Sequence, residues 1–79
     1  MGVRIRYRNR LNPAHIGGRV VVRRWVADAE RGLVPSDVVG ILEAWTDEGV
    51  LVIRTRLGEP VEVHERDILA AKVVPPSPG

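Results

Sequence analysis

Arginines near the N-terminus are the residues whose type and spacing best suit a chemical role. Arg4, Arg6, Arg8 and Arg10 recur at every second position, and Tyr7 lies among them. In a strand, this spacing would present guanidinium groups about 6 to 7 Å apart on one face, near the spacing of phosphates along one nucleic-acid strand. The pattern therefore indicates a polyanion-binding face. The candidate nucleic-acid-binding residues are Arg4, Arg6, Tyr7, Arg8, Arg10, Arg19, Arg23 and Arg24.

The distribution of charge allows two interpretations of these arginines. The net charge is only +2, yet residues 1–24 carry seven arginines and no acid, whereas residues 25–79 carry ten acids against five bases. Basic strands lying beside acidic strands in one sheet would account for this asymmetry, and we favour that interpretation. Nucleic-acid binding is the alternative, and the few aromatic residues and the acidic second half count against it.

Residues that could perform catalysis are not arranged for it. His15 and His64 are 49 residues apart and the chain has no cysteine, so no metal-ligand spacing is present. Asp47 and Glu48 are adjacent carboxylates, but formation of a turn explains them. Ser36 follows a proline and belongs to no nucleophile motif. We therefore expect no catalytic residue, no metal site and no cofactor.

Two tryptophans are the candidate protein-binding residues. Trp25 and Trp45 could line a groove for a peptide, as aromatic residues do in peptide-binding SH3 domains. Such grooves normally gather several aromatic side chains, and this chain has only these two and Tyr7. Packing in or at the rim of a core is therefore the favoured role of both tryptophans, and protein binding is the second.

The first half of the chain predicts two strands and two loops. Apolar and basic residues alternate over residues 3–8, which indicates a strand with one apolar face. Residues 9–18 contain Asn-Pro and Gly-Gly pairs and predict a loop in which Ile16 is the apolar anchor. Residues 19–26 predict a strand that turns Val20 and Val22 to the core. Residues 27–36 predict a long polar loop.

The second half predicts strands joined by tight turns. Gly40 indicates a bulge or bend within the strand that precedes Trp45. Residues 46–49 predict a type I turn with Gly49 in the left-handed conformation, and Gly58-Glu59 predicts a turn left open by Pro60. Residues 65–69 predict a single 3₁₀ or α-turn that places Ile68 in the core. The strands expected here are residues 37–45, 50–57, 61–64 and 70–74.

These elements predict one all-β domain, a small SH3-like five-stranded barrel with an optional extra N-terminal strand. The 79 residues suffice for one domain, and β-branched residues must fill its core because Phe is absent. We divide the chain into a basic arm or extra strand (1–16), the barrel (17–75) and a proline-rich tail or linker (76–79). No apolar run has the length of a signal peptide or a membrane span, so a cytoplasmic protein without membrane contact is expected.

Spaced glycine and apolar positions resemble a known family. They are Gly18-Arg19-Val20-Val21-Val22-Arg23, Ser36-Asp37-Val38-Val39-Gly40, residues 50–56, Gly58, Val61-Glu62-Val63 and Asp67-Ile68-Leu69-Ala70-Ala71-Lys72. In these the chain resembles, over about residues 17–75, the SH3-like N-terminal module of actinobacterial GNAT-family acetyltransferases. The acetyl-CoA signature of the GNAT fold is absent. The resemblance therefore implies the accessory module alone, without the catalytic domain that follows it in that family.

The sequence thus leads to two hypotheses of function. The first is a non-catalytic accessory or interaction module that docks on a protein partner or on a catalytic domain, in cis or in trans. The alternative is a stand-alone nucleic-acid-binding barrel that uses its arginine-rich N-terminal strand. Salt dependence separates them, because phosphate contacts weaken steeply as salt rises.

Overall fold

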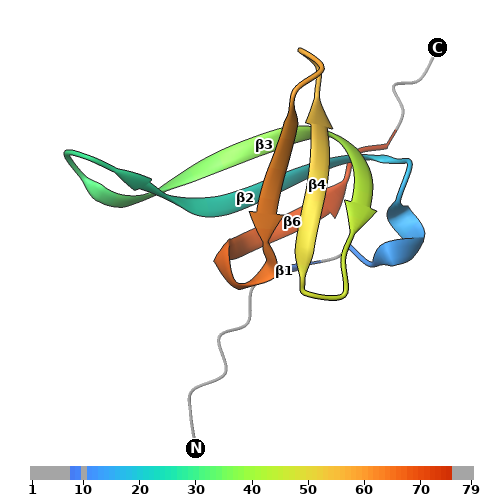
Figure 1. Ribbon diagram of the computed structural model, residues 1–79, viewed down its shortest axis with the longest axis horizontal. Coiled ribbons are helices and arrows are strands. Elements are labelled where there is room, and N and C mark those ends of the chain that lie inside the picture. The colour runs from blue at the N-terminus through green and yellow to red at the C-terminus, as the bar shows by residue number, and fades with distance from the viewer. Residues whose placement is uncertain (1–7, 10, 76–79) are drawn as a thin grey trace, which may run out of the picture.

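The structure, a computed structural model, describes residues 8–9 and 11–75 and consists of one six-stranded sheet coiled into a small barrel (Figure 1). The strands are β1 (Arg8–Asn9), β2 (Arg19–Asp28), β3 (Gly32–Trp45), β4 (Val50–Thr55), β5 (Pro60–His64) and β6 (Ile68–Val73). The two short 3₁₀ helices are η1 (Pro13–His15) and η2 (Glu65–Asp67). The described residues contain no α-helix, and none of their helices has the length and apolarity needed to cross a membrane.

The strand order is β1-β6-β2-β3-β4-β5, and the five strands β2 to β6 pair antiparallel. β1 is the additional strand, and it pairs parallel with β6, Arg8 lying opposite Ala70. This confirms the predicted all-β barrel of five strands with an extra strand from the N-terminal segment. The rest of the strand predicted over residues 3–8 lies outside the described residues.

The core is made by alternate residues of each strand. Val20 and Val22 of β2 are fully buried, which confirms the face predicted for that strand, and Leu51 and Ile53 of β4 are fully buried as well. Branched aliphatic side chains suit this interior because they pack well on a pleated surface. The buried core residues are Leu11, Val20, Val22, Val38, Leu42, Leu51, Ile53, Val63, Ile68 and Ala71.

Two of the predicted turns form as expected. Gly49 has φ +85° and donates its N–H to the carbonyl of Thr46 at 3.0 Å, which is the turn predicted for residues 46–49. η2 turns the chain into β6 and leaves Ile68 buried, also as predicted. The turn before Pro60 differs from the prediction. The backbone N–H of Thr55 donates to the carbonyl of Glu59 at 2.9 Å. The loop therefore closes one residue before Pro60 and does not need the N–H that Pro60 lacks.

Gly40 is not the site of the predicted bulge. It keeps regular register opposite Thr55, and the register shift between β3 and β4 lies instead between Leu42 and Ala44. A Cβ atom at position 40 would lie 2.2 Å from the carbonyl oxygen of Arg54. Glycine is therefore required here because the backbones of β3 and β4 approach too closely for a side chain.

The loop predicted over residues 27–36 is wrong, because β2 and β3 continue through most of it. β2 reaches Asp28 and β3 begins at Gly32, and the two remain paired to that end. Pairing between β2 and β6 stops at Arg24. Beyond it the chain forms a two-stranded ribbon that projects from the barrel, the teal and green hairpin of Figure 1. We call this ribbon, residues 25–35, the hairpin arm.

The segment before β2 is anchored differently from the prediction. Leu11 is buried in the core, whereas the predicted anchor, Ile16, is exposed. The side chain of Asn12 accepts a hydrogen bond from Ala14 N–H at 2.9 Å, and Nδ1 of His15 accepts one from Asn12 N–H at 3.1 Å. This reciprocal capping closes η1 directly after Leu11, so the leucine enters the core and Ile16, which follows the turn, remains in solvent.

Candidate functional site

The arginines proposed from the sequence do not share one face. Arg4, Arg6, Tyr7 and Arg10 lie outside the described residues, and Arg8 is placed only by its backbone in β1. Arg23 and Arg24 are adjacent in β2 and point to opposite sides of the sheet. The N-terminal arginine set therefore stays a prediction, and its β2 members are divided between the two faces.

Arg23 and Arg24 already have partners within the barrel. Arg23 lies directly opposite Asp37 in the register, with 3.6 Å between Nη1 and Oδ1 and both side chains about half exposed. Nη1 of Arg24 donates to the carbonyl of Glu62 in β5 at 3.2 Å, and its Nε is buried without a partner among the described residues. The Arg23–Asp37 pair is what the favoured interpretation of the charge asymmetry predicts, namely opposite charges on neighbouring strands.

The two tryptophans occupy different environments. Trp45, at the end of β3, is half-buried against the core, and its indole N–H donates a hydrogen bond to a carboxylate oxygen of Glu65. Trp25 lies opposite Pro35 in the hairpin arm and is 41% exposed. Of the two, Trp25 is the one available to a partner.

The hairpin arm carries a second large apolar side chain. Leu33 is 66% exposed and lies opposite Ala27, the next pair on the same face after Trp25 and Pro35. Sequence reasoning missed Leu33 because it assigned residues 27–36 to a loop, where side chains have no common face. The signal that was available is a pair of apolar runs, residues 25–27 and 33–35, on either side of a short polar turn.

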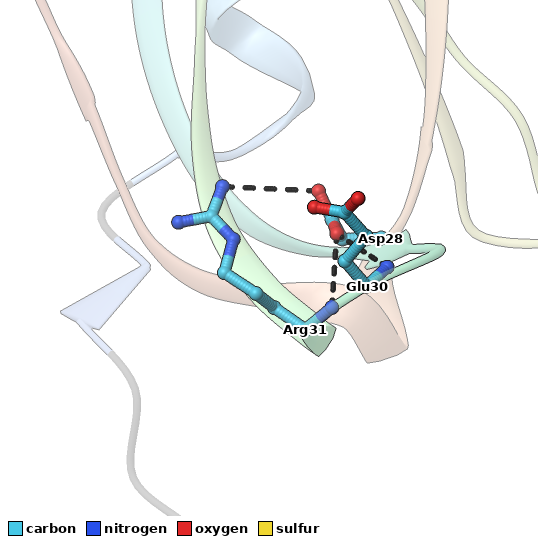
Figure 2. Close-up of polar contacts among 3 residues, drawn as sticks. All are labelled: Asp28, Glu30 and Arg31. Atoms are coloured by element: carbon cyan, nitrogen blue, oxygen red, sulfur yellow. Dashed lines mark hydrogen bonds and ion pairs between the residues drawn. The ribbon is translucent and has the colours of Figure 1, made fainter.

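Hydrogen bonds at the tip of the hairpin arm fix its shape. Oδ1 of Asp28 accepts the backbone N–H groups of Glu30 at 2.8 Å and Arg31 at 3.0 Å (Figure 2). Nη2 of Arg31 also lies 3.8 Å from Oδ2 of Asp28. Gly32, with φ +77°, returns the chain into β3. The turn is thus held by its own side chains, and the apolar residues on the two strands that lead into it remain exposed.

A shallow basic groove lies on the outer face of β2, β3 and β4, and no residue pattern had pointed to it. Its volume is about 410 Å³. Val39 and Ile41, both about two-fifths exposed, provide its apolar surface, and three arginines surround them. The lining residues are Arg19, Val39, Gly40, Ile41, Arg54, Thr55, Arg56 and Gly58.

The arginines of this groove differ in their partners. Nε of Arg54 is 2.7 Å from Oε2 of Glu43, and its Nη1 donates to the carbonyl of Gly58 at 2.6 Å. The hydrogen bond and the charge of Glu43 raise the pKa of Arg54 above its usual value, against a smaller opposing effect of burial. Within the described part of the chain, Arg19 and Arg56 have no ion-pair partner.

A second hollow, of about 360 Å³, lies at the opposite end of β4 and is polar. Glu48, Gly49, His64, Glu65 and Arg66 line it. Glu65 is already bonded to Trp45. Among the described residues, no three His, Cys, Asp or Glu side chains cluster in a way that could hold a metal ion.

Comparison with known proteins gives one match. The sequence profile of one protein family, described as the Rv0428c N-terminal Sm-like domain, matches residues 14–72. This range runs from η1 to the penultimate residue of β6 and so includes the whole antiparallel barrel except its last residue. No curated protein and no solved structure gives a significant match.

Proposed function

We propose that this chain, which belongs to the Rv0428c N-terminal Sm-like domain family and has its small β-barrel-type fold, is a non-catalytic module that docks on a protein partner. Its binding element is the hairpin arm. The single observation that carries this proposal is the exposure of Trp25 and Leu33 on a two-stranded ribbon that no other strand of the described residues covers.

The unfavourable free energy of an exposed apolar hairpin supports this role for the arm. An isolated two-stranded hairpin is marginally stable in water, and large apolar side chains gain nothing from facing solvent. Burial of Trp25 and Leu33 against a partner would remove apolar surface from water at about 25 cal/mol per Å². Aromatic anchors of this kind dominate the binding energy of many protein interfaces.

The partner that we propose is an acetyltransferase domain of the GNAT fold, in cis or in trans. The basis is the resemblance of residues 17–75 to the module that precedes such domains. The barrel itself would then supply no catalytic group, and acetyl transfer would belong to the partner.

The test is calorimetric titration of the chain with a purified GNAT-fold domain encoded beside or in continuation with it. We expect micromolar binding that the double substitution Trp25→Ser and Leu33→Ser weakens by more than about tenfold, or about 1.4 kcal/mol. Leu57→Ser is the matched control, because Leu57 is 82% exposed in the turn between β4 and β5. Unchanged affinity of the double variant would contradict the proposal, and so would an equal loss of affinity in the Leu57→Ser control.

Nucleic-acid binding through residues 4–10 is the second candidate function. The concentration of seven arginines and no acid in residues 1–24 favours it. The test is titration with generic DNA and RNA in rising salt, beside the variant with Arg4, Arg6, Arg8 and Arg10 changed to Ser. Binding that falls with a log–log slope of about −0.9 per phosphate contact and is lost in the variant would support this candidate. Absence of binding at low salt would exclude it.

A further inference from the structure

The basic groove has a geometry and charge of its own, independent of the hairpin arm. We propose that it binds a phosphate ester that carries an apolar or planar organic group, of about the size of a mononucleotide. The argument rests on the register of three strands, the balance of charge and the apolar strip between the arginines.

The strand register sets two arginines on either side of one exposed isoleucine. Arg19 of β2 and Arg54 of β4 both lie directly opposite Ile41 of β3. Residues directly opposite one another point to the same face of a sheet, and neighbouring strands are about 4.8 Å apart. The Cα atoms of the two arginines are therefore about 10 Å apart across Ile41. Side chains of this length can converge on one ligand seated above the isoleucine.

The charge of the groove suits a doubly charged anion. Three arginines and no acidic residue line it, and Glu43 neutralises one of the three from outside. About two positive charges remain, on Arg19 and Arg56. A phosphate monoester carries about 1.5 to 2 negative charges at neutral pH, whereas a carboxylate carries one. Charge complementarity thus favours a phosphate ester over an acidic side chain.

The apolar strip accounts for the organic part of the ligand. Val39 and Ile41 are exposed on the outer face of β3, and Gly40 between them adds no side chain. A sugar or base can cover these aliphatic groups, and guanidinium planes of arginine stack on nucleobases. A volume of about 410 Å³ lies within the range of small-ligand sites, which is about 300 to 1,000 Å³.

Arg54 is already oriented before any ligand arrives. Glu43 holds its Nε and the carbonyl of Gly58 holds its Nη1, so the side chain has lost much of its rotamer freedom in the free protein. Binding at a pre-organised group avoids part of the entropy cost of immobilising a long side chain. Arg54 therefore forms the fixed wall of the site, and Arg19 and Arg56 close on the phosphate.

The experiment follows backbone amide NMR shifts while the protein is titrated with adenosine monophosphate, inorganic phosphate or a short single-stranded oligothymidylate without terminal phosphates. We expect adenosine monophosphate to shift the amides of residues 39–41 and 54–56 with a Kd of about 1 mM or tighter. Inorganic phosphate should bind more weakly because it does not use the apolar strip. Tighter binding of the mononucleotide identifies a free nucleotide as the source of the phosphate ester, and equal or tighter binding of the oligonucleotide identifies a single strand.

One double variant and two controls decide the outcome. Arg19→Gln with Arg56→Gln should weaken nucleotide binding by about tenfold or more, because two charge-assisted contacts are lost. Arg66→Gln removes an exposed arginine from η2, outside the groove, and should change the Kd by less than about twofold. Trp25→Ser with Leu33→Ser should leave it unchanged, so failure of the docking proposal and failure of this one are distinguishable. No shift in residues 39–41 at about 10 mM nucleotide, or equal loss with Arg66→Gln, would overturn the proposal.

Discussion

Trp45 and Glu65 join two separate turns at one end of the barrel. The indole N–H of Trp45, the last residue of β3, donates to a carboxylate oxygen of Glu65 in η2. The backbone N–H of Glu65 in turn donates to the carbonyl of Gly49 at 2.9 Å. The connection between β3 and β4 is thereby tied to the connection between β5 and β6, so this end of the barrel is closed by hydrogen bonds as well as by packing.

We predict that Glu65→Ala lowers the free energy of unfolding by about 1.5 kcal/mol, since a half-buried indole N–H loses a charged acceptor. Glu65→Gln keeps an acceptor and should cost less than half of this. Urea unfolding followed by tryptophan fluorescence measures both changes, and the emission of Trp45 should also shift. An alanine variant as stable as the parent protein would show that the hydrogen bond contributes nothing.

Gly40→Ala is predicted to be the most damaging single-methyl addition in the barrel. Its Cβ would lie 2.2 Å from the carbonyl oxygen of Arg54, and a backbone atom cannot move aside without breaking the pairing of β3 with β4. The expected cost is about 3 kcal/mol or more.

Gly18→Ala is the comparison for this substitution. A Cβ there would meet only the carbonyl oxygen of His15, at 3.2 Å, so a small shift of the loop accommodates it. Thermal unfolding should therefore show a much larger fall in Tm for Gly40→Ala than for Gly18→Ala. Equal falls would mean that the approach of β3 to β4 is not what requires glycine at position 40.

The sequence was sufficient for the parts of the fold that depend on local chemistry. Gly49 after two acidic residues predicts its own turn, and alternation in β2 predicts that Val20 and Val22 are buried. The hairpin arm was missed because a polar composition was interpreted as a loop, although Asp28 and Gly32 are the residues that a tight hairpin turn uses. Leu11 was missed as an anchor because capping by Asn12 and His15, rather than hydrophobicity, decides which residue enters the core.

The basic groove could not be predicted from sequence patterns at all. Arg19, Ile41 and Arg54 are far apart in the chain and share a face only through the register of three strands. Register depends on the turns and on the bulge between Leu42 and Ala44, and a shift of one residue would send Ile41 to the other face. The sequence indicated the arginines of residues 4–10 instead, because their regular spacing is visible without knowledge of how the strands pair.

Asp28 is predicted to control local opening of the hairpin arm. Asp28→Ala removes the acceptor of two backbone N–H groups, so the amides of Glu30 and Arg31 should exchange with solvent several-fold faster. Asp28→Asn keeps a side-chain oxygen and should preserve most of the protection. Hydrogen exchange measured by NMR tests this, with the amide of Leu51 as an internal reference because Leu51 is fully buried in β4. Faster exchange at Leu51 as well would indicate global rather than local destabilisation.

Substitution of Thr55 and of Thr46 by valine should change the free energy of unfolding in opposite directions. The hydroxyl of Thr55 is buried and has no hydrogen-bond partner among the described residues, whereas the hydroxyl oxygen of Thr46 accepts the N–H of Val50 at 3.1 Å. Thr55→Val removes an unpaired buried polar group and should raise the free energy of unfolding by about 1 kcal/mol. Thr46→Val leaves a backbone N–H without its acceptor and should lower it by about the same amount. Urea unfolding with a constant m-value would report each change as a shift of the midpoint, and a midpoint lowered by Thr55→Val would show that its hydroxyl is in fact bonded.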